Sequence, residues 1–124
     1  MENEFKAKVV ALILRKKAEI ALDILGKKYS VKPPNLKVGR VKGSRRSLGV
    51  YVLAENTIYI SSSDGLGNPR VILHEFYHHL RSISGRHRGT EKHAQRFADD
   101  FIESYVRLFK ENPELILRDD MLDK

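Results

Sequence analysis

The chain has 124 residues, 41% of them hydrophobic and 31% charged, which fits one folded domain and excludes a largely disordered chain. It has no cysteine, so disulfide bonds and thiolate metal ligands are excluded, and any metal must be held by histidine and carboxylate. The net charge of +7, from 23 basic and 16 acidic side chains, favours an anionic partner such as nucleic acid without identifying one.

Nothing in the sequence divides the chain or directs it to a membrane. It has no internal repeat, low-complexity tract or linker, so we expect a single domain over residues 1–124. The N-terminal residues alternate in charge rather than forming an apolar signal core, and the longest apolar run, Val9–Leu14, is far too short for a membrane span. We therefore expect a cytoplasmic protein without membrane contact.

The N-terminal part of the sequence predicts a helix followed by a short strand. Apolar residues recur at helical spacing from about residue 4 to residue 25, with a break that could fall near residues 15–17 and with Gly26 as a stop signal. Pro33-Pro34 forbids continuation of the helix and imposes extended backbone, after which residues 36–41 indicate a short basic strand.

The middle of the sequence predicts a β-hairpin. Residues 48–53 and 57–61 are β-branched and aromatic runs, and the three residues Ala54-Glu55-Asn56 separate them. We expect these two runs to pair as antiparallel strands, so that the sheet is small and either antiparallel or mixed.

Two long helices are predicted after the hairpin. Residues 61–69 are dense in turn formers and end in a proline that suits the first turn of a helix running to about residue 83. Beyond a basic loop, Thr90 is a candidate N-cap for an amphipathic helix over about residues 91–110, and residues 114–124 could add a short helix. The plan is α+β: an N-terminal helix, a small three-stranded sheet and two further helices.

The first of these two helices carries the motif HEFYH at residues 74–78. Histidines four positions apart differ by about 40° around a helix axis, so His74 and His78 project from one face and can bind one ion. Glu75 lies about 100° from His74, where it could reach a metal-bound water and act as the general base. The alternative is a chance match of two ordinary histidines, which the preceding apolar run Val71–Leu73 makes less attractive.

Zinc suits these ligands because neutral imidazole binds it well, it has no redox chemistry, and a catalytic site leaves one position open for water. Zinc lowers the pKa of bound water to about 7 and polarises a carbonyl group, while Glu75 would take the proton of the water. The motif therefore predicts hydrolysis of peptide bonds in protein or peptide substrates.

A catalytic zinc needs a third protein ligand, and the candidates after the motif are His87, Glu91 and His93. On a helical wheel Glu91 lies about 60° from the centre of the apolar stripe of the last long helix, and His93 about 100° from it. This geometry favours Glu91 and leaves His93 open. Glu91 could alternatively serve only to offset the helix dipole. The stripe comprises Ala94, Phe97, Ala98, Phe101, Ile102, Tyr105 and Leu108.

For the other histidines and the tyrosines, the sequence gives less support for a role in the site. His79 points about 100° away from His78, which indicates a packing or supporting role, and His87 lies in a basic loop where a solvated histidine is expected. Tyr59, Tyr77 and Tyr105 are candidate oxyanion donors, but each is equally suited to a strand or a core.

Three segments together resemble a known family. Ile58–Ile60, Val71–His78 and Glu91–Ala98 look like the strand, the HExxH helix and the E-x-x-A-N-x-F-A helix of the ImmA/IrrE-type zinc peptidases and related minimal gluzincins. The likeness covers about residues 48–102. It implies a peptidase acting on protein substrates, in which His74, His78 and Glu91 hold zinc and Glu75 is the catalytic base.

A second family within the zinc peptidases is also similar. SprT-like proteases act on proteins attached to DNA and usually have a histidine as third ligand, which would be His93. Two basic clusters could then contact phosphate, although a solvated basic surface is an equal reading. The clusters are Lys37, Arg40, Lys42, Arg45 and Arg46, and Arg81, Arg86 and Arg88.

The leading hypothesis is a zinc metalloendopeptidase in which a strand edge, at residues 50–53 or 58–61, aligns an extended peptide beside the zinc. The hypothesis of a different class is a non-catalytic zinc-binding regulatory or DNA-associated module. Self-association that keeps the site latent is a further expectation, because a chain of 124 residues has few segments that could cover a cleft.

Overall fold

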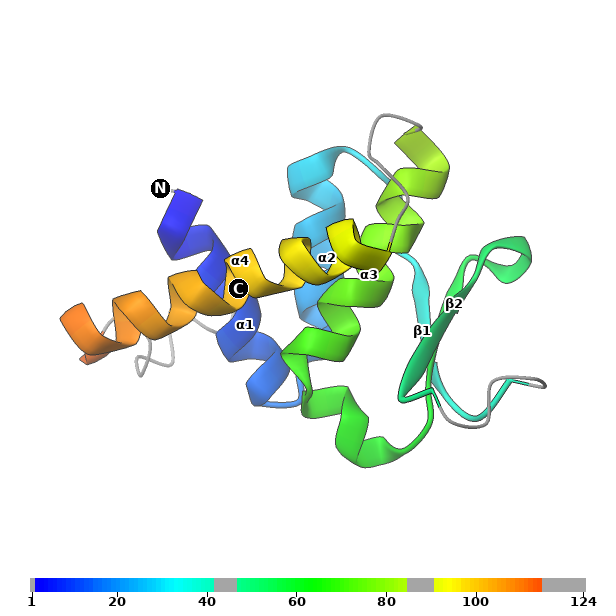
Figure 1. Cartoon of the computed structure of the whole chain (residues 1–124), viewed down its shortest axis with the longest axis horizontal. Coiled ribbons are helices and arrows are strands. Elements are labelled where there is room, and N and C mark those ends of the chain that lie inside the picture. Colours follow the sequence, from blue (N-terminus) through cyan, green and yellow to red (C-terminus); the bar gives the residue numbers. More distant parts are fainter. Residues whose placement is uncertain (1, 42–46, 85–90, 115–124) are drawn as a thin grey trace.

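The computed structural model describes residues 2–41, 47–84 and 91–114. Within these residues, four helices stand beside a three-stranded sheet (Figure 1). This arrangement confirms the α+β class and the small mixed sheet that the sequence predicts. The helices are α1 (Glu2–Leu14), α2 (Ala18–Tyr29), α3 (Pro69–Ser84) and α4 (Glu91–Glu111), and the strands are β1 (Asn35–Val38), β2 (Gly49–Val52) and β3 (Thr57–Ile60).

The N-terminal helical segment consists of two helices that turn back on each other. The break falls at residues 15–17, where Lys16 has a φ of +63°. The predicted stop at Gly26 is wrong, because α2 continues to Tyr29 and ends at Ser30, which adopts the left-handed conformation. Gly26 is instead buried where the chain returns, and a Cβ there would lie 2.7 Å from the Val31 carbonyl oxygen.

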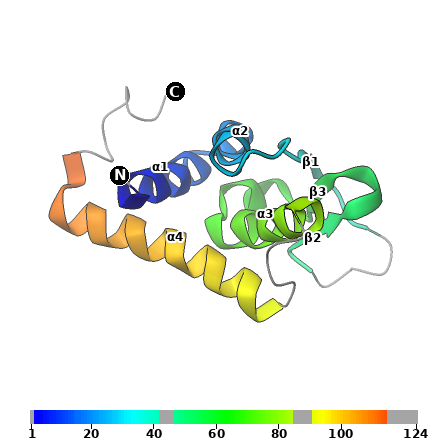
Figure 2. The ribbon, with the colours of Figure 1, turned by 90° about the horizontal axis from the view of Figure 1, so that it is seen from above.

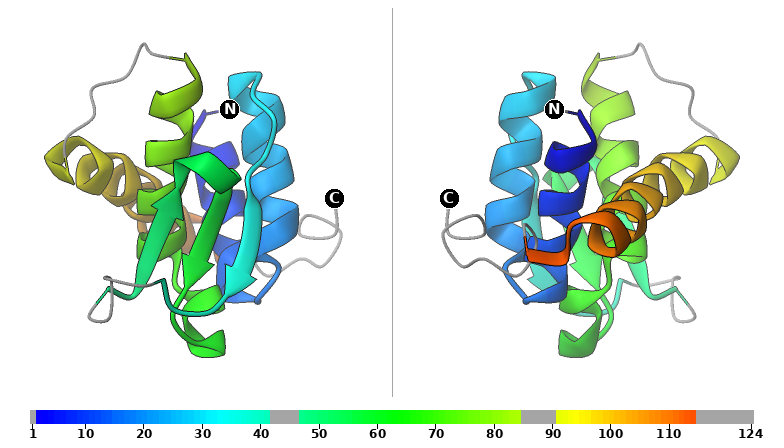
Figure 3. Two further views of the ribbon diagram at one scale, coloured as in Figure 1. Left: turned by 90° about the vertical axis from the view of Figure 1, so that its right-hand side faces the viewer. Right: turned by 90° about the vertical axis from the view of Figure 1, so that its left-hand side faces the viewer.

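The strand order is β1-β3-β2, so β3 is central and the other two strands form the edges. β1 pairs with β3 in parallel, with Leu36 opposite Ile58, and β2 pairs with β3 in antiparallel fashion, with Tyr51 opposite Ile58. The hairpin is therefore confirmed, while β1 ends at Val38, before Val41. Figure 3 shows the three strands side by side, with the helices behind them.

One hydrophobic core joins the sheet to the helices. α4 packs against both α1 and α3, and Figure 2 shows it running along the same side of the two. Phe76 of α3 and Phe97 of α4 lie 6.2 Å apart between ring centroids, and Phe97 lies 4.9 Å from Phe101. These contacts place the beginning of α4 beside α3. The most deeply buried large side chains are Phe76, Phe101, Leu12, Ile13, Leu22, Leu25, Ile58, Ile60, Ile72, Leu73 and Leu80.

Several expectations lie outside the described residues. They are the N-cap role of Thr90, the helix expected after Glu114, and the surroundings of Lys42, Arg45, Arg46, Arg86, His87 and Arg88. None of the helices in the described ranges has the length and apolar character needed to cross a membrane.

Candidate metal centre

The HExxH motif lies in the middle of α3, and burial of one side of the helix orients it. Ile72, Leu73 and Phe76 are fully buried in the core, which leaves His74 and His78 on the flank of the helix. Their side chains are 17% and 22% exposed, and their ring centroids are 5.1 Å apart. The predicted pair of imidazoles therefore shares one partly open face of α3.

Glu91, the first residue of α4, meets both imidazoles. Its Oε1 lies 2.6 Å from His74 Nε2 and its Oε2 lies 3.0 Å from His78 Nε2, while its side chain is 78% exposed. In the described ranges, His74, His78 and Glu91 form a group whose ligand atoms all lie within 4.8 Å of one another. His93 is exposed and does not belong to this group. Of the three candidates for the third ligand, His87 lies outside the described residues, and of the other two Glu91 is the one that reaches the histidines.

These three donor atoms are compatible with zinc. Two imidazoles and one carboxylate are a ligand set of catalytic zinc sites, and two ligands of a tetrahedral zinc stand about 3.3–3.6 Å apart. His74 Nε2 and His78 Nε2 lie 2.6 and 3.0 Å from Oε1 and Oε2 of Glu91, respectively, and the ligand atoms of the three residues lie within 4.8 Å of one another. Small side-chain shifts would bring them to the spacing of a zinc site. Each Nε2 must lose any proton it shares with Glu91 before it binds a cation, so metal binding should weaken as the pH falls.

Glu75 is buried beside this group, with 8% of its surface exposed. Burial raises the pKa of Glu75 to about 7, and the charge of Glu91 adds to the increase. His74 and a hydrogen bond from the Tyr51 main-chain N–H act in the opposite direction on the same pKa. A carboxylate with a pKa near neutrality can both accept and return a proton, which is the property of a general base.

Burial also lowers the pKa of His78, and the charges of His74 and Arg81 act in the same direction, while Glu91 opposes them. A lowered pKa keeps an imidazole neutral near pH 7, the form in which it binds a metal. Burial thus favours the neutral form of both His78 and Glu75.

A cleft of about 510 Å³ opens between α3 and β2 beside these residues. Because β2 is an edge strand, its outer main-chain groups face this cleft. Ser61 N–H donates to the Leu48 carbonyl, so the pleat directs the main-chain groups of Gly49 and Tyr51 away from β3. The cleft is lined by Ser47, Gly49, Val50, Tyr51, Leu53, Glu75, His78, Arg81, Ser82 and Glu91.

His79, for which the sequence indicates only a packing or supporting role, has its partners in distant parts of the chain. His79 is fully buried; its Nε2 lies 2.7 Å from the Lys32 carbonyl oxygen, and its Nδ1 lies 2.8 Å from the Tyr51 hydroxyl. Burial lowers the pKa of His79, whereas the hydrogen bond to Lys32 raises it. The sequence carried no signal for these partners beyond the presence of a second histidine directly after the motif.

The three candidate tyrosines lie elsewhere. Tyr77 is buried against Phe97, Tyr105 stacks on Phe109, and the Tyr59 hydroxyl donates to the Glu55 carboxylate. None of the three lines the cleft, whereas Tyr51, which is not among the predicted candidates, does.

Lys37 and Arg81 represent the two basic clusters among the residues that the structure describes. Lys37 belongs to β1 and Arg81 to α3, next to β2, so they lie at opposite edges of the sheet. Arg81 lines the cleft, where it can meet a substrate as readily as a phosphate group.

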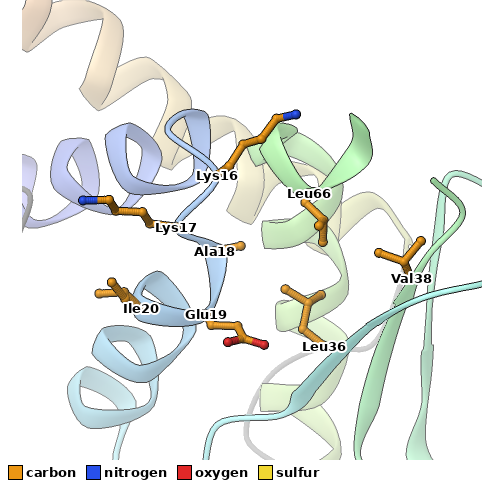
Figure 4. Close-up of a pocket in the computed structure, with 8 residues that line it drawn as sticks. All are labelled: Lys16, Lys17, Ala18, Glu19, Ile20, Leu36, Val38 and Leu66. Atoms are coloured by element: carbon orange, nitrogen blue, oxygen red, sulfur yellow. The ribbon is translucent and has the colours of Figure 1, made fainter. Parts of the chain in front are cut away.

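A second hollow, of about 350 Å³, lies on the β1 side of the molecule (Figure 4). Leu36, Val38 and Leu66 line it, and the Lys17 ammonium group points away from it. Among the described residues that line it, Glu19 is the one acidic side chain, so these residues lack the grouped metal-binding side chains of the cleft beside β2.

Comparison of the chain with family models, curated proteins and solved structures found no match. The likeness to the ImmA/IrrE-type peptidases therefore stays a resemblance of residue pattern. Any function must be argued from the site itself.

Proposed function

We propose that this chain is a zinc-dependent metalloendopeptidase with His74, His78 and Glu91 as metal ligands and Glu75 as general base. The support is the meeting of two imidazoles and one carboxylate from two helices, directly beside a second, buried carboxylate. A merely structural ion pair would not need a proton acceptor with a pKa near 7 in the same cleft. The cytoplasmic location expected from the sequence stays a prediction.

Zinc, when bound, would supply Lewis acidity for a water molecule and for the scissile carbonyl group. Glu75 takes a proton from the water and returns it to the amine that leaves. The Tyr51 N–H holds the carboxylate of Glu75 in place during both transfers. Partial burial of the cleft strengthens these polar interactions because less water competes for them.

The substrate would lie along β2 rather than β3. Of the two strand edges that the sequence left open, β3 is central in the sheet and β2 borders the cleft. The outward main-chain groups of Gly49 can pair with an extended peptide, which would place its backbone between β2 and α3. This mode requires an unfolded or exposed segment of a protein as substrate.

The test is hydrolysis of a fluorescently labelled, unfolded protein by enzyme loaded with one equivalent of zinc. Glu75→Gln should bind zinc as the wild type does and lose at least about 100-fold in turnover, because it cannot accept a proton. Glu103→Gln removes an exposed carboxylate twelve positions along α4 from Glu91 and should leave turnover unchanged. Turnover retained in Glu75→Gln would contradict the proposal, and zinc binding without any turnover would favour a regulatory module.

A further inference from the structure

His79 connects three segments of the chain behind the candidate site. Its ring is fully buried, lies edge-on to the Tyr51 ring at 5.3 Å, and contacts Phe76 at 5.8 Å between centroids. Its two nitrogens contact β2, through the Tyr51 hydroxyl, and the segment after α2, through the Lys32 carbonyl. Two polar contacts on a residue with no exposed surface indicate a defined geometry rather than simple filling of the core.

The chemistry of the two partners determines where the ring proton lies. A carbonyl oxygen can only accept a hydrogen bond, so Nε2 of His79 must carry hydrogen and donate it to Lys32. In the neutral ring, Nδ1 is then an acceptor for the Tyr51 hydroxyl, which lies 2.8 Å away. The same hydroxyl lies 3.2 Å from Asn56 Oδ1, and we assign its single hydrogen to the shorter contact, with His79. His79 therefore fixes the position of the Tyr51 side chain through a directional bond.

Tyr51 is also the residue whose main chain contacts the candidate base. Its N–H hydrogen-bonds the Glu75 carboxylate, while its side chain reaches His79. Glu75 and His79 are four positions apart on α3, so both lie on the side of the helix that faces β2. Tyr51 is thus bonded to α3 at two places one helical turn apart: its main chain contacts Glu75, and its side chain contacts His79.

We propose that His79 is a positioning residue for Glu75: by holding the Tyr51 hydroxyl it keeps the Tyr51 N–H on the Glu75 carboxylate and fixes the edge of β2 beside the metal ligands. The inference deepens the proposed function and rests on it. His79 itself touches neither the metal ligands' donor atoms nor the cleft.

Two variants of one residue separate its two bonds. The amide of His79→Asn reaches the place of Nδ1 and can still accept from Tyr51, whereas the amide of His79→Gln reaches the place of Nε2 and can still donate to Lys32. Tyr51→Phe removes the hydroxyl and keeps the ring. Circular dichroism shows which variants fold, and Tyr51→Phe, the least disruptive of them, carries the test if a His79 variant does not.

The first measurement is amide hydrogen exchange at Tyr51 in the metal-free protein, so it does not depend on activity. We expect exchange at this amide at least about tenfold faster in His79→Gln and Tyr51→Phe, and within about threefold of wild type in His79→Asn, because only the first two lose the Tyr51 bond. Unchanged exchange in both His79→Gln and Tyr51→Phe would overturn the inference, whatever the activity of the protein.

The second measurement is steady-state kinetics of the zinc-loaded variants. We expect kcat to fall at least about tenfold in His79→Gln and Tyr51→Phe, with zinc content unchanged, and to recover in His79→Asn. The double variant Tyr51→Phe/His79→Gln should resemble Tyr51→Phe, since that substitution already removes the bond to His79, together with the contact of the hydroxyl with Asn56. The inference would be overturned if the losses of kcat in the two single variants added up in the double variant. It would also be overturned if His79→Asn lost as much kcat as His79→Gln. Absence of turnover in the wild type would instead reject the proposed function.

Discussion

Two carboxylates, Glu75 and Glu91, stand within one site in very different surroundings. Glu91 is 78% exposed at the start of a helix, and its two carboxylate oxygens lie 2.6 and 3.0 Å from the two imidazoles, where they could serve as ligands. Glu75 is buried, and its pKa of about 7 suits it to take up and release a proton. Two residues of the same type are thus suited to different roles because one is exposed and the other is buried.

The buried histidine gives a pH-dependent stability that can be measured without metal. In the unfolded chain His79 titrates near pH 6.5, whereas burial lowers its pKa in the folded protein. As the pH falls through about 6.5, the unfolded chain gains a proton that the folded protein does not, so this residue's contribution to stability is lost on acidification. Glu75 acts in the opposite direction, because its raised pKa lets the folded state bind a proton below about pH 7.

Because the two residues act in opposite directions, the contribution of His79 to the pH dependence of stability is measured by comparing the wild type with His79→Gln. Urea unfolding in the presence of a chelator, at pH 7.5, 6.5 and 5.5, should show a smaller loss of unfolding free energy on acidification in His79→Gln than in the wild type. Equal slopes in the two proteins would mean that the His79 ring is not held neutral.

At the scale of elements, close approach of segments matters as much as helical propensity. The end of α2 shows this, because Gly26 sits inside the helix where alanine would ordinarily be preferred by about 0.5–1 kcal/mol. A Cβ at this position would lie 2.7 Å from the Val31 carbonyl oxygen and 3.2 Å from Pro33 Cδ. The glycine therefore lets the segment of residues 31–33 pack closely against α2. This segment contains Lys32, whose carbonyl contacts His79.

Gly26→Ala should therefore lower the free energy of unfolding by about 1–3 kcal/mol, since the backbone must shift to relieve the overlap. Gly67→Ala is the matched control, because a Cβ there meets its nearest atom at 3.5 Å, an ordinary contact. Chemical denaturation of both variants measures the difference. A Gly26→Ala protein as stable as the wild type would show that the segment of residues 31–33 can shift to accept a Cβ without loss of stability.

At the scale of the whole molecule, the candidate ligands join α3 to α4. Glu91 is 17 residues from His74 along the chain, and α4 is otherwise held by aromatic packing against α3 and α1. An ion bound only by the folded chain stabilises it in proportion to the logarithm of its free concentration. Metal binding and folding should therefore be coupled.

Zinc should raise the midpoint of thermal unfolding, and at a free concentration 100 times the dissociation constant it should add about 2.7 kcal/mol to the free energy of unfolding. A chelator should reverse the shift in the wild type and in His93→Ala, and Glu91→Ala should show a smaller shift than either. Thermal scans at several zinc concentrations provide the measurement. An identical shift in Glu91→Ala and the wild type would remove Glu91 from the ligand set.

The sequence predicts most of this architecture because its strongest signals are local. Spacing alone predicts that His74 and His78 share a face of a helix, and the helical wheel favours Glu91 over His93. The link between His79 and Tyr51 spans 28 residues and depends on how the sheet packs on α3, which no local pattern encodes. The predicted helix stop at Gly26 is wrong for the same reason, since this glycine accommodates Val31 and Pro33, which lie outside its own helix.

The most direct test of the central claim is the zinc content of proteins purified without added metal, measured by elemental analysis in the wild type, His74→Ala, Glu91→Ala and His93→Ala. We predict about one zinc per chain in the wild type and in His93→Ala, and its loss in His74→Ala and Glu91→Ala, because the donor atoms of His74, His78 and Glu91 meet within 4.8 Å. Zinc retained in Glu91→Ala and lost in His93→Ala would contradict this ligand set and favour the SprT-like alternative. Absence of zinc from all four proteins would contradict a metal site altogether.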